Sequence, residues 1–100
     1  MTEALIHKVD CVRLSVPDLE SGLSFYRDRL GLDLIWRTEQ ALGLRLPEDE
    51  TEIVLHIEPQ KPEIDLLVAC ADEAAAQVEA AGGAVLVPPF DIQIGRCVLV

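Results

Sequence analysis

Apolar and polar side chains alternate over residues 11–16, and this repeat of two predicts a β-strand with two different faces. Pro17 ends the strand. The next segment repeats every three to four residues and predicts an amphipathic helix over 18–30. Asp18 is placed to cap the start of this helix, and Gly31 follows where helices commonly end in left-handed backbone. The apolar stripe of the helix consists of Leu19, Leu23, Tyr26 and Leu30.

The second half of the chain repeats the order of elements seen in the first. A strand leads into a helix that Asp72 is expected to cap, and Gly82 and Gly83 are expected to end it. Pro88 and Pro89 are expected to break the strand that follows this helix. The remaining predicted strands cover 33–39, 41–46, 52–58, 63–70, 84–87 and 94–100, and the second helix covers 72–81.

An internal repeat with an offset of 52 residues relates the two halves, because Val12 moves onto Ile64 and Gly31 onto Gly83. The unit is strand–helix–strand–strand–strand, and the second copy lacks its last strand. We therefore expect one α+β domain over the whole chain, with paired βαβββ modules related by a pseudo-two-fold axis. Both helices are expected to lie outside the sheet. The modules cover about 8–58 and 63–100.

The charge of the chain narrows the classes of partner. Eight Lys and Arg residues oppose 18 Asp and Glu residues, which gives a net charge of −10. Such a chain repels phosphate backbones and anionic lipid surfaces, so we expect no nucleic-acid or membrane partner. A small neutral or cationic molecule, or another protein, remains as the expected partner.

Cysteine usage indicates a reducing compartment. The three cysteines are odd in number and form no closely spaced pair, which is typical of buried thiols rather than disulfides. No apolar run approaches the roughly 20 residues of a membrane span, and no secretory leader is visible. We expect a cytoplasmic protein. The cysteines are Cys11, Cys70 and Cys97.

The segment 11–32 resembles the opening module of the glyoxalase, bleomycin-resistance and extradiol-dioxygenase superfamily, also called vicinal oxygen chelate. The most specific part of the resemblance is the run 24–26, Ser-Phe-Tyr, followed by Leu30 and Gly31. The strand 53–57 and the second module also fit. The resemblance implies a curled mixed sheet around one cleft, frequent dimerisation and one more strand after the last residue shown. It covers isomerases, lyases, epimerases, dioxygenases and metal-free antibiotic-binding proteins, so the fold alone does not choose among these functions.

In metal-binding members of this superfamily, each module supplies one ligand from its first strand and one from its last. Here these positions hold Cys11, His56 and Glu63, with the fourth beyond Val100, and the offset of 52 independently pairs Cys11 with Glu63. Thiolate, imidazole and carboxylate suit Zn²⁺, Ni²⁺, Fe²⁺ or Mn²⁺. The superfamily usually has His or another N or O ligand where Cys11 stands. Structural roles remain open for all three: a small buried thiol, a core histidine and an exposed carboxylate.

Three further residues are candidates for substrate binding. Arg13 and Asp65 are also related by the repeat, and they either form a salt bridge with each other or leave Arg13 to hold a substrate carboxylate. Trp36 either walls the pocket or packs in the core.

These features lead to three hypotheses about the function of the protein. The first is a divalent-metal-dependent lyase or isomerase that acts on vicinal oxygens, with Glu63 as the group that transfers a proton. The alternative is a metal-free protein that sequesters a cationic or aromatic small molecule. The third is a structural dimer with an empty apolar cleft. Each is expected to be a homodimer.

Overall fold

The computed structural model describes residues 4–100. It divides into two compact units. One unit is continuous and runs from Val9 to Leu66, and the other combines the N-terminal residues up to Lys8 with Leu67–Val100. The chain therefore crosses between the units inside its first and fifth strands.

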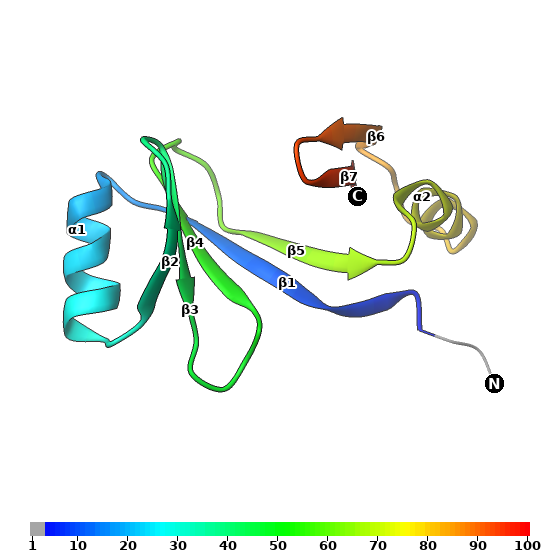
Figure 1. Cartoon of the computed structure of the whole chain (residues 1–100). Coiled ribbons are helices and arrows are strands. Elements are labelled where there is room, and N and C mark those ends of the chain that lie inside the picture. The colour runs from blue at the N-terminus through cyan, green and yellow to red at the C-terminus, as the bar shows by residue number, and fades with distance from the viewer. Residues whose placement is uncertain (1–3) are drawn as a thin grey trace. The chain divides into compact units, whose positions relative to one another are not determined.

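The main sheet has five strands in the order β2-β3-β4-β1-β5 (Figure 1). The pairing of β1 with β4 is parallel, whereas β3 pairs antiparallel with both β2 and β4. A mixed sheet combined with separate helices confirms the α+β prediction. The strands are β1 (Ile6–Ser15), β2 (Asp33–Arg37), β3 (Ala41–Arg45), β4 (Glu52–His56) and β5 (Glu63–Val68).

The first helix begins where the sequence predicts, although it changes pitch part-way. The helix α1 (Leu19–Leu23) continues into a π-helical stretch, Ser24–Arg29. The Asp18 carboxylate accepts a hydrogen bond from the backbone N–H of Ser21 at 2.7 Å, which confirms the predicted cap. Gly31 has a φ of +82°, the left-handed backbone expected at the end of the helix.

The core of the first unit lies between α1 and one face of the sheet. Leu23, Leu42, Leu44 and Leu55 are fully buried there. The strand register places Leu55 between Leu42 on β3 and Leu14 on β1. Since one face of this sheet is committed to an apolar core, strand alternation turns the intervening polar residues to the opposite face.

The second unit contains the helix α2 (Ala71–Ala80) and a hairpin of β6 (Val87–Ile92) and β7 (Gly95–Leu99). Cys70 occupies the N-cap of α2 and makes no side-chain capping bond. The prediction that Asp72 caps this helix is therefore wrong: it lies in the first turn.

The predicted strand 84–87 is also wrong, because β6 starts at Val87 and runs through Pro88 and Pro89. The pairing of β6 with β7 shifts register between Val87 and Phe90. Proline cannot donate to a strand ladder but is tolerated at such an irregularity. The two prolines thus lie inside β6 without breaking it.

The repeat between the modules is not uniform at the helix ends. The left-handed glycine after α2 is Gly82, with a φ of +95°, whereas the offset of 52 residues pairs Gly31 with Gly83. The second helix thus ends one residue earlier than the repeat implies. The pseudo-two-fold superposition of the strands, and the module boundaries 8–58 and 63–100, stay predictions.

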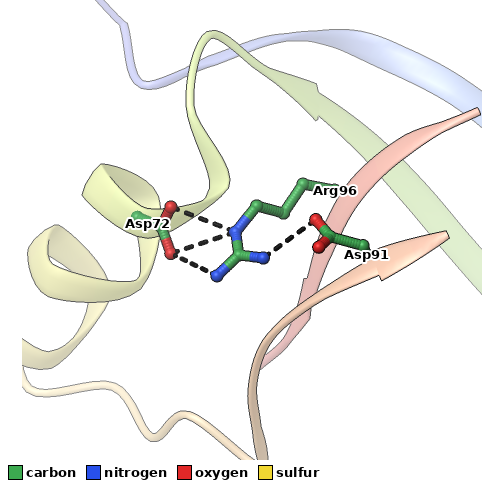
Figure 2. A network of polar contacts seen from close by, with 3 residues as sticks. All are labelled: Asp72, Asp91 and Arg96. Atoms are coloured by element: carbon green, nitrogen blue, oxygen red, sulfur yellow. Dashed lines mark hydrogen bonds and ion pairs between the residues drawn. The ribbon is translucent and has the colours of Figure 1, made fainter.

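An arginine joins the helix and the hairpin of the second unit. The Arg96 guanidinium donates to both carboxylate oxygens of Asp72, with Nε at 3.1 Å and Nη2 at 3.2 Å, and its Nη1 donates to Asp91 at 2.9 Å (Figure 2). Asp72 belongs to α2, Asp91 to β6 and Arg96 to β7. Arg96 therefore joins α2 to both strands of the hairpin that follows it.

Replacing Arg96 with Met is expected to loosen the second unit. Because all three side chains are partly exposed, we expect a loss of about 1 kcal/mol or less in the stability of that unit. Amide hydrogen exchange of α2 should become severalfold faster. The control is Arg29→Met, which should leave exchange in α2 unchanged. Equal exchange in the Arg96 variant and the parent would contradict this role.

Candidate functional site

A row of polar residues covers the face of the main sheet that points away from α1. The parallel register pairs Cys11 with Glu52, and Ser15 with His56. Arg13 lies between Cys11 and Ser15 on the same face, because side chains of a strand alternate. Every candidate site residue taken from the sequence lies on this face, which we call the polar face: Cys11, Arg13, Trp36, His56, Glu63 and Asp65.

The thiol of Cys11 is a hydrogen-bond donor. Its Sγ lies 3.1 Å from Oδ2 of Asp65, on the neighbouring strand β5. Burial and this hydrogen bond to Asp65 raise the pKa of the Cys11 thiol to about 12 from an ordinary 9.0. At neutral pH, the Cys11 thiol of the metal-free chain is consequently protonated.

Alkylation should separate Cys11 from Cys70. Cys70 is exposed, so iodoacetamide at pH 8 should label it about a hundredfold faster than Cys11 in the folded chain. The labelling rate of Cys11 should keep rising above pH 9.0, where an ordinary thiol levels off. Peptide mass spectrometry measures both rates. Equal labelling of the two cysteines in folded protein would contradict the buried thiol–carboxylate pair.

An ion pair lies next to the thiol on the same face. Nε of Arg13 is 3.7 Å from Oε2 of Glu63. The sequence favoured Asp65 as the partner of Arg13, and this is wrong: the Asp65 carboxylate accepts from Cys11, and Arg13 meets Glu63. Hydrogen bonding to Asp65 and partial burial raise the pKa of Glu63 above its ordinary value, against the opposing effect of Arg13.

The Arg13 side chain retains unused donor capacity. Its Nε is buried and has no hydrogen-bond partner among the described residues, since 3.7 Å is too long for a hydrogen bond to Glu63. Because the side chain as a whole is 35% exposed, its guanidinium can still donate to an oxygen of a bound molecule.

His56 lies at the other end of the polar face. It is only 2% exposed, and its Nε2 contacts the amide nitrogen of Gln60 at 3.3 Å. Its Nδ1 is buried with no hydrogen-bond partner in the described part of the chain. Glu52 is the register partner of Cys11, and His56 lies four residues beyond Glu52 on the same strand. At 3.3 Å per residue, the backbone positions of Cys11 and His56 are therefore about 13 Å apart along the strands.

These positions test whether Cys11, His56 and Glu63 fit one metal ion. Donors that share an ion lie about 2.0–2.3 Å from it, so their tips are about 4 Å apart. The separation of Cys11 from His56 along the strands is far larger. Within residues 4–100, no group of three or more His, Cys, Asp and Glu residues is arranged to hold a metal. The three residues therefore do not fit a metal as one ligand set.

A tryptophan and a glutamate form a further contact on the polar face. The indole N–H of Trp36 donates to Oε1 of Glu52 at 2.6 Å. Glu52 is not among the candidate residues predicted from the sequence. The alternation of strand 52–58 carries the relevant signal, because it places Glu52 on the same face as His56.

An open hollow of about 540 Å³ lies beside Glu52. It is formed by the end of β3, the loop that follows and the start of β4. Its charged lining is mostly acidic: Arg45, Glu48, Asp49, Glu50 and Glu52.

Comparison with protein families identifies the fold. The family model described as the Glyoxalase/Bleomycin resistance protein/Dioxygenase superfamily matches residues 8–98. The chain belongs to this superfamily. The resemblance inferred from residues 11–32 is thereby confirmed.

One solved structure with the same fold is the methylmalonyl-CoA epimerase from Mycobacterium tuberculosis. The match has a TM-score of 0.73 at 18% identity and covers 95% of this chain and 78% of the epimerase chain. It confirms the glyoxalase-like fold with its curled mixed sheet. Among curated proteins, no sequence matches significantly. No helix in residues 4–100 is long and apolar enough to cross a membrane.

Proposed function

We propose that this superfamily member is an isomerase or lyase that moves a proton at a carbon next to a carbonyl group. The arrangement that supports the proposal is the contact between Arg13 and Glu63 on the polar face, with Asp65 beside them. A cation placed next to a carboxylate supplies both halves of such a reaction, since one group binds the substrate oxygen and the other takes the proton.

In the proposed step, the carboxylate of Glu63 removes the proton from the α-carbon. The C–H bond breaks, its electron pair moves to the carbonyl oxygen, and Glu63 holds the proton. The Arg13 guanidinium, whose side chain is 35% exposed, donates to the resulting enolate oxygen. When the enolate turns over in the site, return of the proton from Glu63 to the other face of the carbon completes an isomerisation. In an elimination, the enolate electrons instead form the α,β double bond and the β-substituent departs with its bonding pair.

Asp65 and Trp36 have supporting roles in this proposal. Asp65 raises the pKa of Glu63 toward the working pH, where a proton-transfer group is most effective. Trp36 is 38% exposed and forms the apolar wall of the site. A metal-dependent mechanism with the ion bound by Cys11, His56 and Glu63 requires that these three side chains reach one point. Because these do not, no step here depends on a metal.

The superfamily neighbour suggests the probe for a direct test. Epimerisation exchanges the α-proton, so proton transfer in deuterium oxide exchanges that position with solvent. We expect α-deuteration of methylmalonyl thioesters by NMR, faster with the N-acetylcysteamine thioester than with the phosphate-bearing CoA thioester, because the chain carries a net charge of −10. A protein that binds these probes without exchanging deuterium would contradict the proposal.

The second candidate function is metal-free binding of a small molecule without catalysis. The four-residue separation of Cys11 and His56 favours it over metal-dependent chemistry. If the chain binds the thioester probes without exchanging deuterium, metal-free binding becomes the better-supported function.

The homodimer and the cytoplasmic location stay predictions from the sequence. Sedimentation equilibrium of the chain at tens of micromolar should show a dimer, since ordinary interfaces associate at about that concentration. A monomer under these conditions would contradict the dimer prediction.

A further inference from the structure

The side chain of Trp36 lies flat across the sheet instead of standing upright on it. Trp36 belongs to β2, and its indole reaches over the adjacent β3 to donate to Glu52 on β4. Where the indole crosses β3 it passes over Gly43, its register partner. One side of the ring therefore covers the sheet, and the other side is open.

Gly43 makes this arrangement possible because it has no side chain. A Cβ atom at this position would overlap Nε1 and Cε2 of the Trp36 ring, and it would lie 2.6 Å from Cδ1. Gly43 itself is buried. The orientation of the indole is thus fixed twice, by the glycine beneath it and by the 2.6 Å hydrogen bond to Glu52 at its edge.

The surroundings of the ring carry charges of both signs, because Arg13 lies in the same cross-strand row as Trp36 through Gly43 and Val54, where it contacts Glu63. Glu52 uses Oε1 to bind the indole, which leaves its negative charge at the edge of the ring. Glu52 is the register partner of Cys11, whose thiol donates to the Asp65 carboxylate. On the other side Glu52 lines the acidic hollow of about 540 Å³. Arg45 is the register partner of Glu52 on β3, and it is an exposed cation.

We propose that the open side of Trp36, held in place by Gly43 and Glu52, is a binding site for an organic cation of the quaternary or methylated ammonium class. An aromatic face attracts a cation through its quadrupole, and the indole gives the strongest such interaction. The neighbouring carboxylate adds direct attraction, and methyl groups on the nitrogen lower the cost of removing water from the cation. This goes beyond the proposed proton transfer and does not depend on Glu63 acting as a base.

The single tryptophan of the chain provides the readout. The intact chain is titrated with choline while Trp36 fluorescence is recorded. A parallel titration uses the neutral alcohol in which carbon replaces the quaternary nitrogen. We expect saturable binding of choline that is at least about tenfold tighter than that of the neutral alcohol, because only the cation gains the electrostatic terms.

Variants then test the residues that hold the ring. Glu52→Ala should weaken choline binding about tenfold, and Gly43→Ala should abolish it by displacing the indole. The matched control is Glu39→Ala, an exposed carboxylate in the turn after β2, and it should bind choline as the parent does. Arg45→Ala should strengthen binding, because it removes a competing cation.

Three results of the choline titrations would contradict the proposed cation site. Equal affinity for choline and the neutral alcohol, no saturation with either, or parent-like binding by Glu52→Ala would each overturn the proposal. Because the added Cβ of Gly43→Ala overlaps the indole, circular dichroism is recorded to check the fold of this variant. If Gly43→Ala unfolds, Glu52→Ala decides the question. If a Glu63 variant loses deuterium exchange but still binds choline, the result supports the cation site and bears only on the proposed proton transfer.

Discussion

Glu63→Gln should slow deuterium exchange into the thioester probe by about 10²- to 10⁴-fold, the usual contribution of a positioned acid–base group. The substitution keeps the size of the side chain and its ability to accept a hydrogen bond, so Arg13 retains a neighbour. What is lost is the site for the proton. The rate of exchange by the parent, measured by NMR over a pH series, should rise with pH because the carboxylate must be deprotonated to act. The midpoint should lie above the ordinary carboxyl pKa of 4.5, since Asp65 and burial raise the pKa of Glu63.

The matched control for this prediction is Glu58→Gln, which changes an exposed carboxylate just after β4. It should exchange deuterium as the parent does. If Glu63→Gln lowered the rate by less than about threefold, Glu63 would not be the proton-transfer group and the mechanism would be incorrect. A fall in thioester binding with an unchanged rate at saturation would assign Glu63 to binding alone.

Leu55→Ala should give the largest loss of stability in the chain. Leu55 is fully buried and lies between Leu14 and Leu42 in the strand register. Its Cδ1 would lie 2.7 Å from a Cβ at Gly22, which shows how closely the helix approaches the sheet at this point. Removing three carbon atoms from such a site leaves a cavity and costs about 2–5 kcal/mol. Urea unfolding followed by Trp36 fluorescence reports directly on this unit.

The comparison for Leu55→Ala is Ile57→Ala, two residues further along and 40% exposed. It should cost less, about 1 kcal/mol, because a substantial part of the side chain is already in contact with water. If both substitutions cost the same, the apolar face of the sheet would not be the core that holds α1 in place.

The polar face could be predicted from the sequence because it depends only on local alternation. Once Leu14 and Leu55 face the core, their neighbours Arg13 and His56 must face the other way. The helix cap at Asp18 is equally local. These features need no knowledge of which strands become neighbours.

The contacts across that face could not be predicted, because they depend on strand register. The sequence alone pairs Arg13 with Asp65, whereas the register of the folded sheet brings Asp65 to Cys11 and Glu63 to Arg13. The separation of Cys11 from His56 has the same origin: both positions match the family pattern, but the parallel pairing of β1 with β4 sets them four residues apart.

The second unit shows where local rules are overridden by tertiary context. Pro88 and Pro89 predict a strand break, but the hairpin partner β7 accommodates them at a shift of register. Asp72 has the chemistry of a helix cap, yet it lies in the first turn of α2 and binds Arg96, which is 24 residues away. A capping signal does not specify which of its possible partners the carboxylate will meet.

The most direct test of the central claim, that the polar face is where the chain binds its small molecule, is a titration of the ¹⁵N-labelled chain with the N-acetylcysteamine thioester. Two side-chain signals belong to this face, the indole N–H of Trp36 and the Nε–H of Arg13, which is buried and unpaired among the described residues. Both should shift saturably with one dissociation constant, while amide signals of α1 on the opposite side of the sheet stay in place. Saturable shifts confined to α1 or to the β6–β7 hairpin, with the Trp36 and Arg13 signals unmoved, would contradict the account.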